Sequence, residues 1–145
     1  MVAGANIQVE ERLREEVERF FAGYRDAYND ADPAAVARHI AVPSILVQRE
    51  TTLWSTDDAL LQAMTELVAF YAKSGYRRAN FTVEQVLPQG TDHAVADIAW
   101  TIERSDGRAA WNFRTGYNLR REDNGVWRIV CCTAYEEIGV RQRMG

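Results

Sequence analysis

The sequence predicts an α+β fold in which helices pack on one face of a curved antiparallel sheet. Two observations predict it: apolar residues recur at helical spacing early in the chain, and from Arg77 onward the apolar period becomes two. In addition, the predicted strands are apolar on one face only, so the helices must cover that face. The length of 145 residues suits one domain, with residues 1–7 expected to form a flexible N-terminus.

Three helices are predicted. The first ends at Asn29-Asp30 and carries a stripe of mainly aromatic and aliphatic residues: Val9, Leu13, Val17, Phe20, Phe21, Tyr24 and Tyr28. Asp32 and Pro33 are typical of an N-cap and a first helical position, so they predict a second, short helix. Ser55 and Asp58 resemble a capping box, which opens a third helix that ends at Gly75. Its apolar side carries Leu60, Leu61, Met64, Leu67, Val68 and Tyr71.

Six strands are predicted. Two short ones cover residues 45–47 and 51–54, and four longer ones cover roughly residues 80–87, 94–103, 109–121 and 126–135. Turn signals containing glycine separate the four long strands at residues 88–90, 105–107 and 123–125.

The turn geometry predicts which side chains share a face of the sheet. A two-residue turn at Asp106-Gly107 puts a mainly apolar set on one face: Ile98, Trp100, Ile102, Trp111, Phe113, Thr115 and Tyr117. A bulge at Gly125 adds Trp127, Ile129, Cys131, Thr133 and Tyr135 to this face. The outer face of the last strand then carries Val130, Cys132 and Ala134. Because these residues are apolar, we expect a homodimer that covers this sheet face.

Charge and compartment signals exclude several classes of protein. Seventeen basic and twenty-one acidic residues give a net charge of −4, which argues against a nucleic-acid partner. The chain has no apolar run of about eighteen residues and no signal-peptide pattern, so no membrane partner is expected. Cys131 and Cys132 are neighbours in one strand and are interpreted as reduced thiols, so we expect a cytoplasmic protein. His39 and His93 match no metal site, and neither a metal nor a cofactor is expected.

Two segments resemble the nuclear transport factor 2-like (NTF2-like) superfamily and its SnoaL-like members. They are YRDAYNDADPAAV at residues 24–36 and YNLRREDNGVWRIV at residues 117–130. The resemblance implies a single SnoaL-like domain over residues 1–145 with a cone-shaped, cystatin-like fold. This superfamily contains isomerases, cyclases, epoxide hydrolases, dehydratases and binding-only proteins, so the fold does not select an activity. If the protein is an enzyme, the resemblance implies a cofactor-independent isomerase, cyclase, dehydratase or hydrolase.

Alignment with the ketosteroid isomerases of this superfamily assigns three positions. Tyr24 falls where those enzymes have the tyrosine of the oxyanion hole, Gln48 near the base and Thr115 near a neutral aspartic acid. Gln48 cannot take a proton, so isomerase chemistry of that kind is not expected. His39 and Tyr24 remain as candidate catalytic residues, and a packing role is the competing interpretation of both.

We therefore expect a cone-shaped pocket that binds, or transforms without a cofactor, a small apolar molecule. The candidate pocket residues are Tyr24, Tyr28, His39, Trp54, Trp100, Trp111, Phe113, Thr115 and Tyr117. The alternative is a non-catalytic dimeric domain, structural or interacting, in which the same aromatic residues fill the cavity.

Overall fold

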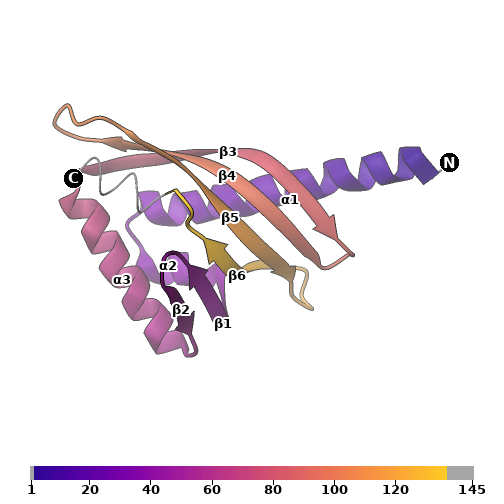
Figure 1. The fold of residues 1–145 in the computed structure, drawn as a ribbon, viewed down its shortest axis with the longest axis horizontal. Coiled ribbons are helices and arrows are strands. Elements are labelled where there is room, and N and C mark those ends of the chain that lie inside the picture. Colours follow the sequence, from indigo (N-terminus) through magenta and orange to yellow (C-terminus); the bar gives the residue numbers. More distant parts are fainter. Residues whose placement is uncertain (1, 137–145) are drawn as a thin grey trace.

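The structure is a computed structural model that describes the backbone of residues 2–136 and the side chains of residues 8–136. Three helices and six strands follow one another along the chain (Figure 1). In order they are α1 (Val2–Asn29), α2 (Pro33–Arg38), β1 (Ile40–Val47), β2 (Thr51–Trp54), α3 (Asp57–Lys73), β3 (Tyr76–Gln89), β4 (His93–Arg104), β5 (Trp111–Arg121) and β6 (Trp127–Thr133). All the predicted elements are present, and the helix α1 includes most of the segment that was expected to be a flexible N-terminus.

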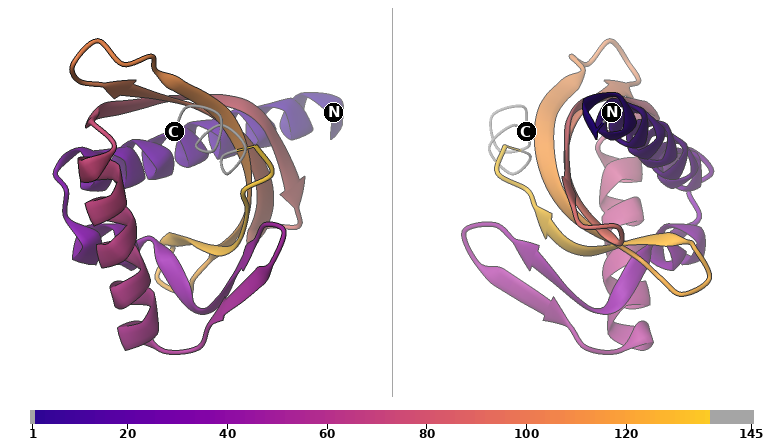
Figure 2. Two further views of the ribbon diagram at one scale, coloured as in Figure 1. Left: turned by 60° about the vertical axis from the view of Figure 1, so that its left-hand side comes forward. Right: turned by 90° about the vertical axis from the view of Figure 1, so that its right-hand side faces the viewer.

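The strands form one sheet in the order β2-β1-β6-β5-β4-β3. Figure 2 shows this sheet curving, with α1 and α3 on its concave side. The α+β class and the one-sided covering of the sheet are thus confirmed. The sheet is mixed rather than purely antiparallel, because β1 lies parallel to β6. The two strands are far apart in the sequence, which is what a parallel pair requires.

The end of α1 is tied to the sheet by the side chain of Asn29. Its Oδ1 accepts hydrogen bonds from the Ala79 backbone N at 2.8 Å and the Tyr76 hydroxyl at 2.5 Å. Its Nδ2 donates to the Ala79 carbonyl at 3.2 Å. Asp32 then caps α2 as predicted, with its carboxylate accepting from the Ala35 backbone N at 3.1 Å. These hydrogen bonds fix the end of α1 against β3 and the start of α2.

The cap of α3 differs from the prediction by one residue. Thr56, not Ser55, is the N-cap, and its hydroxyl accepts from the Ala59 backbone N at 3.1 Å. Both residues can cap a helix, so the sequence pattern does not distinguish them. The C-terminal end agrees with the prediction, since Gly75 follows the helix with a φ of +85° that suits glycine.

The strand register between β4 and β5 is the predicted one. Trp100 pairs with Phe113 and Ile102 with Trp111, so their side chains share the concave face. Between β5 and β6 the predicted alternation is wrong after Ile129. The pairing moves from Leu119 with Ile129 to Asn118 with Cys131, which leaves Val130 as the extra residue of a bulge.

This bulge exchanges the two cysteines between the faces of the sheet. Cys132 pairs with inward-facing Tyr117, and Cys131 lies on the outer face with Asn118. Ala134 is buried, so two of the three apolar residues expected on the outer face are not there. These residues therefore no longer support a homodimer through an apolar outer face, and the homodimer stays a prediction.

The core forms where the aromatic stripe of α1 meets the concave face of the sheet. Phe21 is fully buried, with its ring 4.8 Å from Tyr117 and 6.4 Å from Trp100 between centroids. Tyr24, one turn further on, lies 6.2 Å from Trp100. Phe20 points elsewhere and packs against His39 at 5.4 Å. Burying these rings, together with Leu13, Val17 and Ala27, stabilises α1 against the sheet by the hydrophobic effect.

Replacing Phe21 by Ala is expected to lower the free energy of unfolding by about 3–5 kcal/mol, because it leaves a cavity under the sheet. Urea denaturation followed by circular dichroism measures the change. The matched control is Leu87→Ala, whose side chain is 59% exposed and which should change the free energy far less. An equal, small effect of both substitutions would contradict this account of the core.

Candidate functional site

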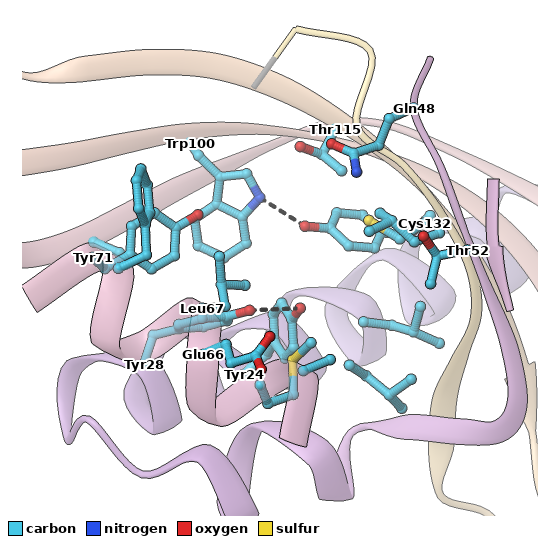
Figure 3. Close-up of a pocket in the computed structure, with 18 of the residues that line it drawn as sticks. Tyr24, Tyr28, Gln48, Thr52, Glu66, Leu67, Tyr71, Trp100, Thr115 and Cys132 are labelled. Atoms are coloured by element: carbon cyan, nitrogen blue, oxygen red, sulfur yellow. Dashed lines mark hydrogen bonds between the residues drawn. The ribbon is translucent and has the colours of Figure 1, made fainter. Parts of the chain in front are cut away.

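A cavity of about 400 Å³ lies between α1, α3 and the concave face of the sheet (Figure 3). Its lining is mostly apolar and comes from every element except α2. The lining residues are Tyr24, Tyr28, Ile40, Ile45, Leu46, Gln48, Thr52, Trp54, Ala63, Met64, Glu66, Leu67, Phe70, Tyr71, Tyr76, Ala79, Trp100, Ile102, Phe113, Thr115, Tyr117, Ile129 and Cys132. A space of this size with a few convergent polar groups is typical of small-molecule sites.

Two hydrogen-bonded pairs bring polar groups to the cavity. Tyr24 and Tyr28 are four residues apart on α1 and therefore lie on one helix face, with their hydroxyl oxygens 3.3 Å apart. Across the cavity, Trp100 Nε1 donates to the Tyr117 hydroxyl at 3.0 Å. Figure 3 shows both pairs together with apolar side chains and with the polar side chains Gln48, Thr52, Glu66 and Thr115.

Burial keeps the Tyr24 phenol protonated. It raises the pKa of Tyr24 well above its ordinary value of 10, and the nearby Tyr28, Tyr117 and Cys132 raise it further. The cause is that a phenolate in this apolar environment would lack hydration. Tyr24 can therefore act as a neutral hydrogen-bond donor, which suits it to polarise a carbonyl group and not to remove a proton.

The opposite wall is formed by the sheet and carries uncharged polar side chains. Thr115 from β5 is 2% exposed, while Gln48 follows β1 and is half-buried. Thr52 from β2 and Glu66 from α3 are exposed and line the cavity nearer the surface. The site is thus apolar in its interior, with hydroxyl and amide groups on two facing walls.

Seven of the nine predicted pocket residues line this cavity, namely Tyr24, Tyr28, Trp54, Trp100, Phe113, Thr115 and Tyr117. The other two, His39 and Trp111, do not. The correctly predicted register identified the aromatic residues of the sheet, and the helical spacing of α1 identified Tyr24 and Tyr28.

His39 lies outside the cavity lining. Its Nδ1–H donates to the Ala35 carbonyl at 2.9 Å, and its ring makes edge contacts with the rings of Phe20 and Tyr24, with centroids 5.4 and 5.7 Å away. Burial lowers the pKa of His39, and nearby Arg128 and Arg38 lower it further. These contacts favour the packing and capping role over the catalytic one.

Trp111 also belongs to the structural core. It is 1% exposed, its ring stacks on Phe70 at 6.3 Å, and the Arg104 guanidinium lies 4.4 Å from its centroid. Its position on the apolar face was predicted correctly, but it lies near the end of the sheet, beyond the cavity lining.

The α3 wall and Cys132 are not among the residues that the sequence predicts for the pocket. Met64, Leu67 and Tyr71 were identified as the apolar side of a helix, and this stripe could have indicated that they face the same space as the sheet. Cys132 carried no such signal, because its inward position depends on the bulge at Val130.

No group of three or more His, Cys, Asp or Glu side chains in residues 8–136 could hold a metal ion. Among the described residues, no helix combines the length and the apolar character needed to cross a bilayer.

Comparison of the sequence with protein families agrees with this architecture. The family described as NTF2-like protein (DUF6841) matches residues 14–137, and the chain belongs to this family. The resemblance noted in the sequence to NTF2-like proteins is thus confirmed. No protein among the curated ones matches the chain significantly.

Solved structures share the fold at low sequence identity. An NTF2-like protein with a cystatin-like fold from Novosphingobium aromaticivorans is 18% identical, with a TM-score of 0.67 over 90% of this chain and 88% of that one. A cystatin-like domain of unknown function from Nostoc punctiforme is 15% identical, with a TM-score of 0.67 over 83% and 74%. A ketosteroid isomerase-like protein from Erwinia carotovora atroseptica is 18% identical, with a TM-score of 0.59 over 81% and 91%. At these identities the similarity concerns the fold alone.

The burial of Tyr24 predicts a pH dependence of stability. Above about pH 10 tyrosines ionise in the unfolded chain, whereas Tyr24 stays neutral in the folded protein, so the folded state binds one more proton and stability falls as the pH rises. Tyr24→Phe should make this decline shallower by about 1.4 kcal/mol per pH unit. Urea unfolding at pH 10.5–11.5 measures the slope. Between pH 8 and 9 the two slopes should agree, and equal slopes above pH 10.5 would contradict the burial of the phenol.

Proposed function

We propose that the protein binds a small, mainly apolar molecule in the cavity, and that any transformation of it proceeds without a cofactor. The observation that carries the proposal is the cavity of about 400 Å³, which most of the core elements line and which their side chains do not fill. A space of this kind costs packing energy, so its retention in a core rich in aromatic residues favours a ligand.

The polar groups support binding more directly than they support catalysis. Either hydroxyl of the Tyr24–Tyr28 pair can be the donor, whereas Trp100 Nε1 already donates to the Tyr117 hydroxyl. In an apolar site, a well-placed hydroxyl donor can stabilise negative charge on a carbonyl oxygen. No side chain of the lining stands at the base position as a carboxylate, since that position is Gln48. Chemistry at the site would therefore rest on hydrogen-bond polarisation or on a bound water.

We also propose a cytoplasmic homodimer that associates through the outer face of the sheet. Cys131 and Cys132 are free thiols, which suits a reducing compartment. The register places Gly116 beside Thr133 and Asn118 beside Cys131 on the outer face, which makes the β5–β6 part of it uncharged and mostly small, while Asp97 on β4 borders it beside Gly116. Such a surface can approach its copy closely about a two-fold axis.

Ligand binding is tested by titrating the tryptophan fluorescence with small ketones, lactones and aromatic acids. Trp54 and Trp100 line the cavity and should report a bound molecule. Ala63→Phe adds a ring to the α3 wall and should weaken binding of any hit by about tenfold or more, since one methylene-sized clash already costs about 1–3 kcal/mol. Ala69→Phe is the matched control, because Ala69 is an exposed residue of α3 outside the lining.

If the two alanine variants bind a hit with equal affinity, the ligand binds outside the cavity. A panel without any hit would favour the alternative, a non-catalytic domain whose cavity serves no ligand.

The homodimer is tested by light scattering at micromolar concentration. A mass of twice the 16.5 kDa of one chain is expected. Gly116→Arg puts a large charged side chain on the outer face and should reduce the mass to that of one chain, whereas Thr91→Arg, at an exposed position in the turn after β3, should not. A wild-type protein with the mass of a single chain would contradict the proposal.

A further inference from the structure

The hydroxyl of Thr115 has no hydrogen-bond partner among the described residues, although its side chain is almost fully buried. Thr115 is 2% exposed and lines the cavity. Buried hydroxyl groups in folded proteins nearly always have a partner, because an unsatisfied one costs stability. The fully buried side-chain atoms without a partner in the described chain are Ser44 Oγ, Trp111 Nε1 and Trp127 Nε1, so the Thr115 hydroxyl keeps some accessible surface. Since Thr115 lines the cavity, a ligand there can place a polar atom against this hydroxyl.

The register brings the amide of Gln48 to the same wall. Val47 on β1 and Gly116 on β5 both pair with Thr133, so one residue further along Gln48 and Thr115 flank Ala134. Ala134 is held in this row by its backbone N, which donates to the Val47 carbonyl at 3.0 Å. Two strand spacings separate the backbones of Gln48 and Thr115 by about 10 Å. Because Ala134 is small, it leaves room for the two side chains to approach each other, and Figure 3 draws both of them at the cavity.

Together these groups can recognise a donor and an acceptor on one ligand. The carboxamide of Gln48 offers two N–H donors and one carbonyl acceptor, and the hydroxyl of Thr115 offers one donor and two acceptor sites. A carboxamide on the ligand presents the complementary set within a single planar group. A hydrocarbon would leave both side chains unsatisfied.

The charge of the wall argues for a neutral ligand. Among the described residues that line the cavity, Glu66 is the single one of a charged type, and none is Lys, Arg or His. A carboxylate ligand would enter a mostly apolar space without a positive partner, which is strongly unfavourable. The negative charge that Glu66 can carry would add repulsion.

We propose that the ligand of this cavity is a neutral, mainly apolar molecule with a carboxamide-like group, which Gln48 and Thr115 bind. This inference rests on the proposed binding function and adds the chemical class of the ligand. Gln48 and Thr115 determine specificity, while the aromatic residues around them supply the apolar contact.

The test compares three probes with the same phenyl group by isothermal titration calorimetry at neutral pH. They are 3-phenylpropanamide, 3-phenylpropanoate and propylbenzene, which present a carboxamide, an anion and no polar group. The amide should bind about tenfold or more tightly than the anion. Thr115→Val, which removes the hydroxyl and keeps the shape, should weaken amide binding about tenfold and leave propylbenzene unchanged.

Thr101→Val is the matched control, because Thr101 lies on the outer face of the same sheet, where its hydroxyl donates to Asn112 Oδ1 at 2.9 Å. It should change none of the three affinities. Gln48→Leu provides a second variant at a half-buried position, with the same expected loss for the amide, in case Thr115→Val does not fold.

The outcomes separate the two proposals. If propylbenzene and the amide bind equally well, or if both variants bind the amide like the wild type, the carboxamide assignment is overturned while binding in the cavity stands. Tighter binding of the anion would overturn it as well. If none of the three probes binds, the carboxamide assignment is overturned, whereas the proposed function is judged by the panel of ketones, lactones and aromatic acids.

Discussion

The contact between the aromatic stripe of α1 and the concave face of the sheet is the interaction on which the rest of this structure depends. Phe21 lies against Tyr117 and Trp100, and one helical turn later Tyr24 reaches the same tryptophan. Tyr24, Trp100 and Tyr117 line the cavity beside this contact, and residues of α3 and β1 line its other sides. The cavity is therefore a consequence of the way in which the core is packed.

The polar groups of the cavity follow from the same packing. Tyr24 and Tyr28 both reach the cavity because they are one helical turn apart. Trp100 and Tyr117 reach it because they lie on neighbouring strands and their side chains point to the same face of the sheet. Burial then keeps Tyr24 neutral by raising its pKa. A cavity built in this way presents neutral donors and acceptors and little charge, which limits both the ligands that it suits and the chemistry that it can support.

The bulge in β6 shows how one residue changes the composition of such a site. With unbroken alternation Cys131 would face inward, but the extra residue Val130 moves Cys132 to the cavity and Cys131 to the outer face. The same shift sets the row in which Ala134 separates Gln48 from Thr115. Both faces of the sheet, and therefore both the ligand site and the surface available for association, depend on this irregularity.

The sequence by itself determined the helices and strands, the apolar character of one face of the sheet, and which side chains of β4 and β5 face inward. These features depend on local periodicity and on a turn that sets the register of its own hairpin. For that reason Tyr24, Trp100, Phe113 and Thr115 could be assigned to one pocket in advance. Only the tertiary structure decided that β1 pairs in parallel with β6, that His39 and Trp111 lie outside the cavity, and that Cys132 lies within it. These features depend on contacts between segments far apart in the chain and on a bulge, neither of which leaves a periodic signal in the sequence.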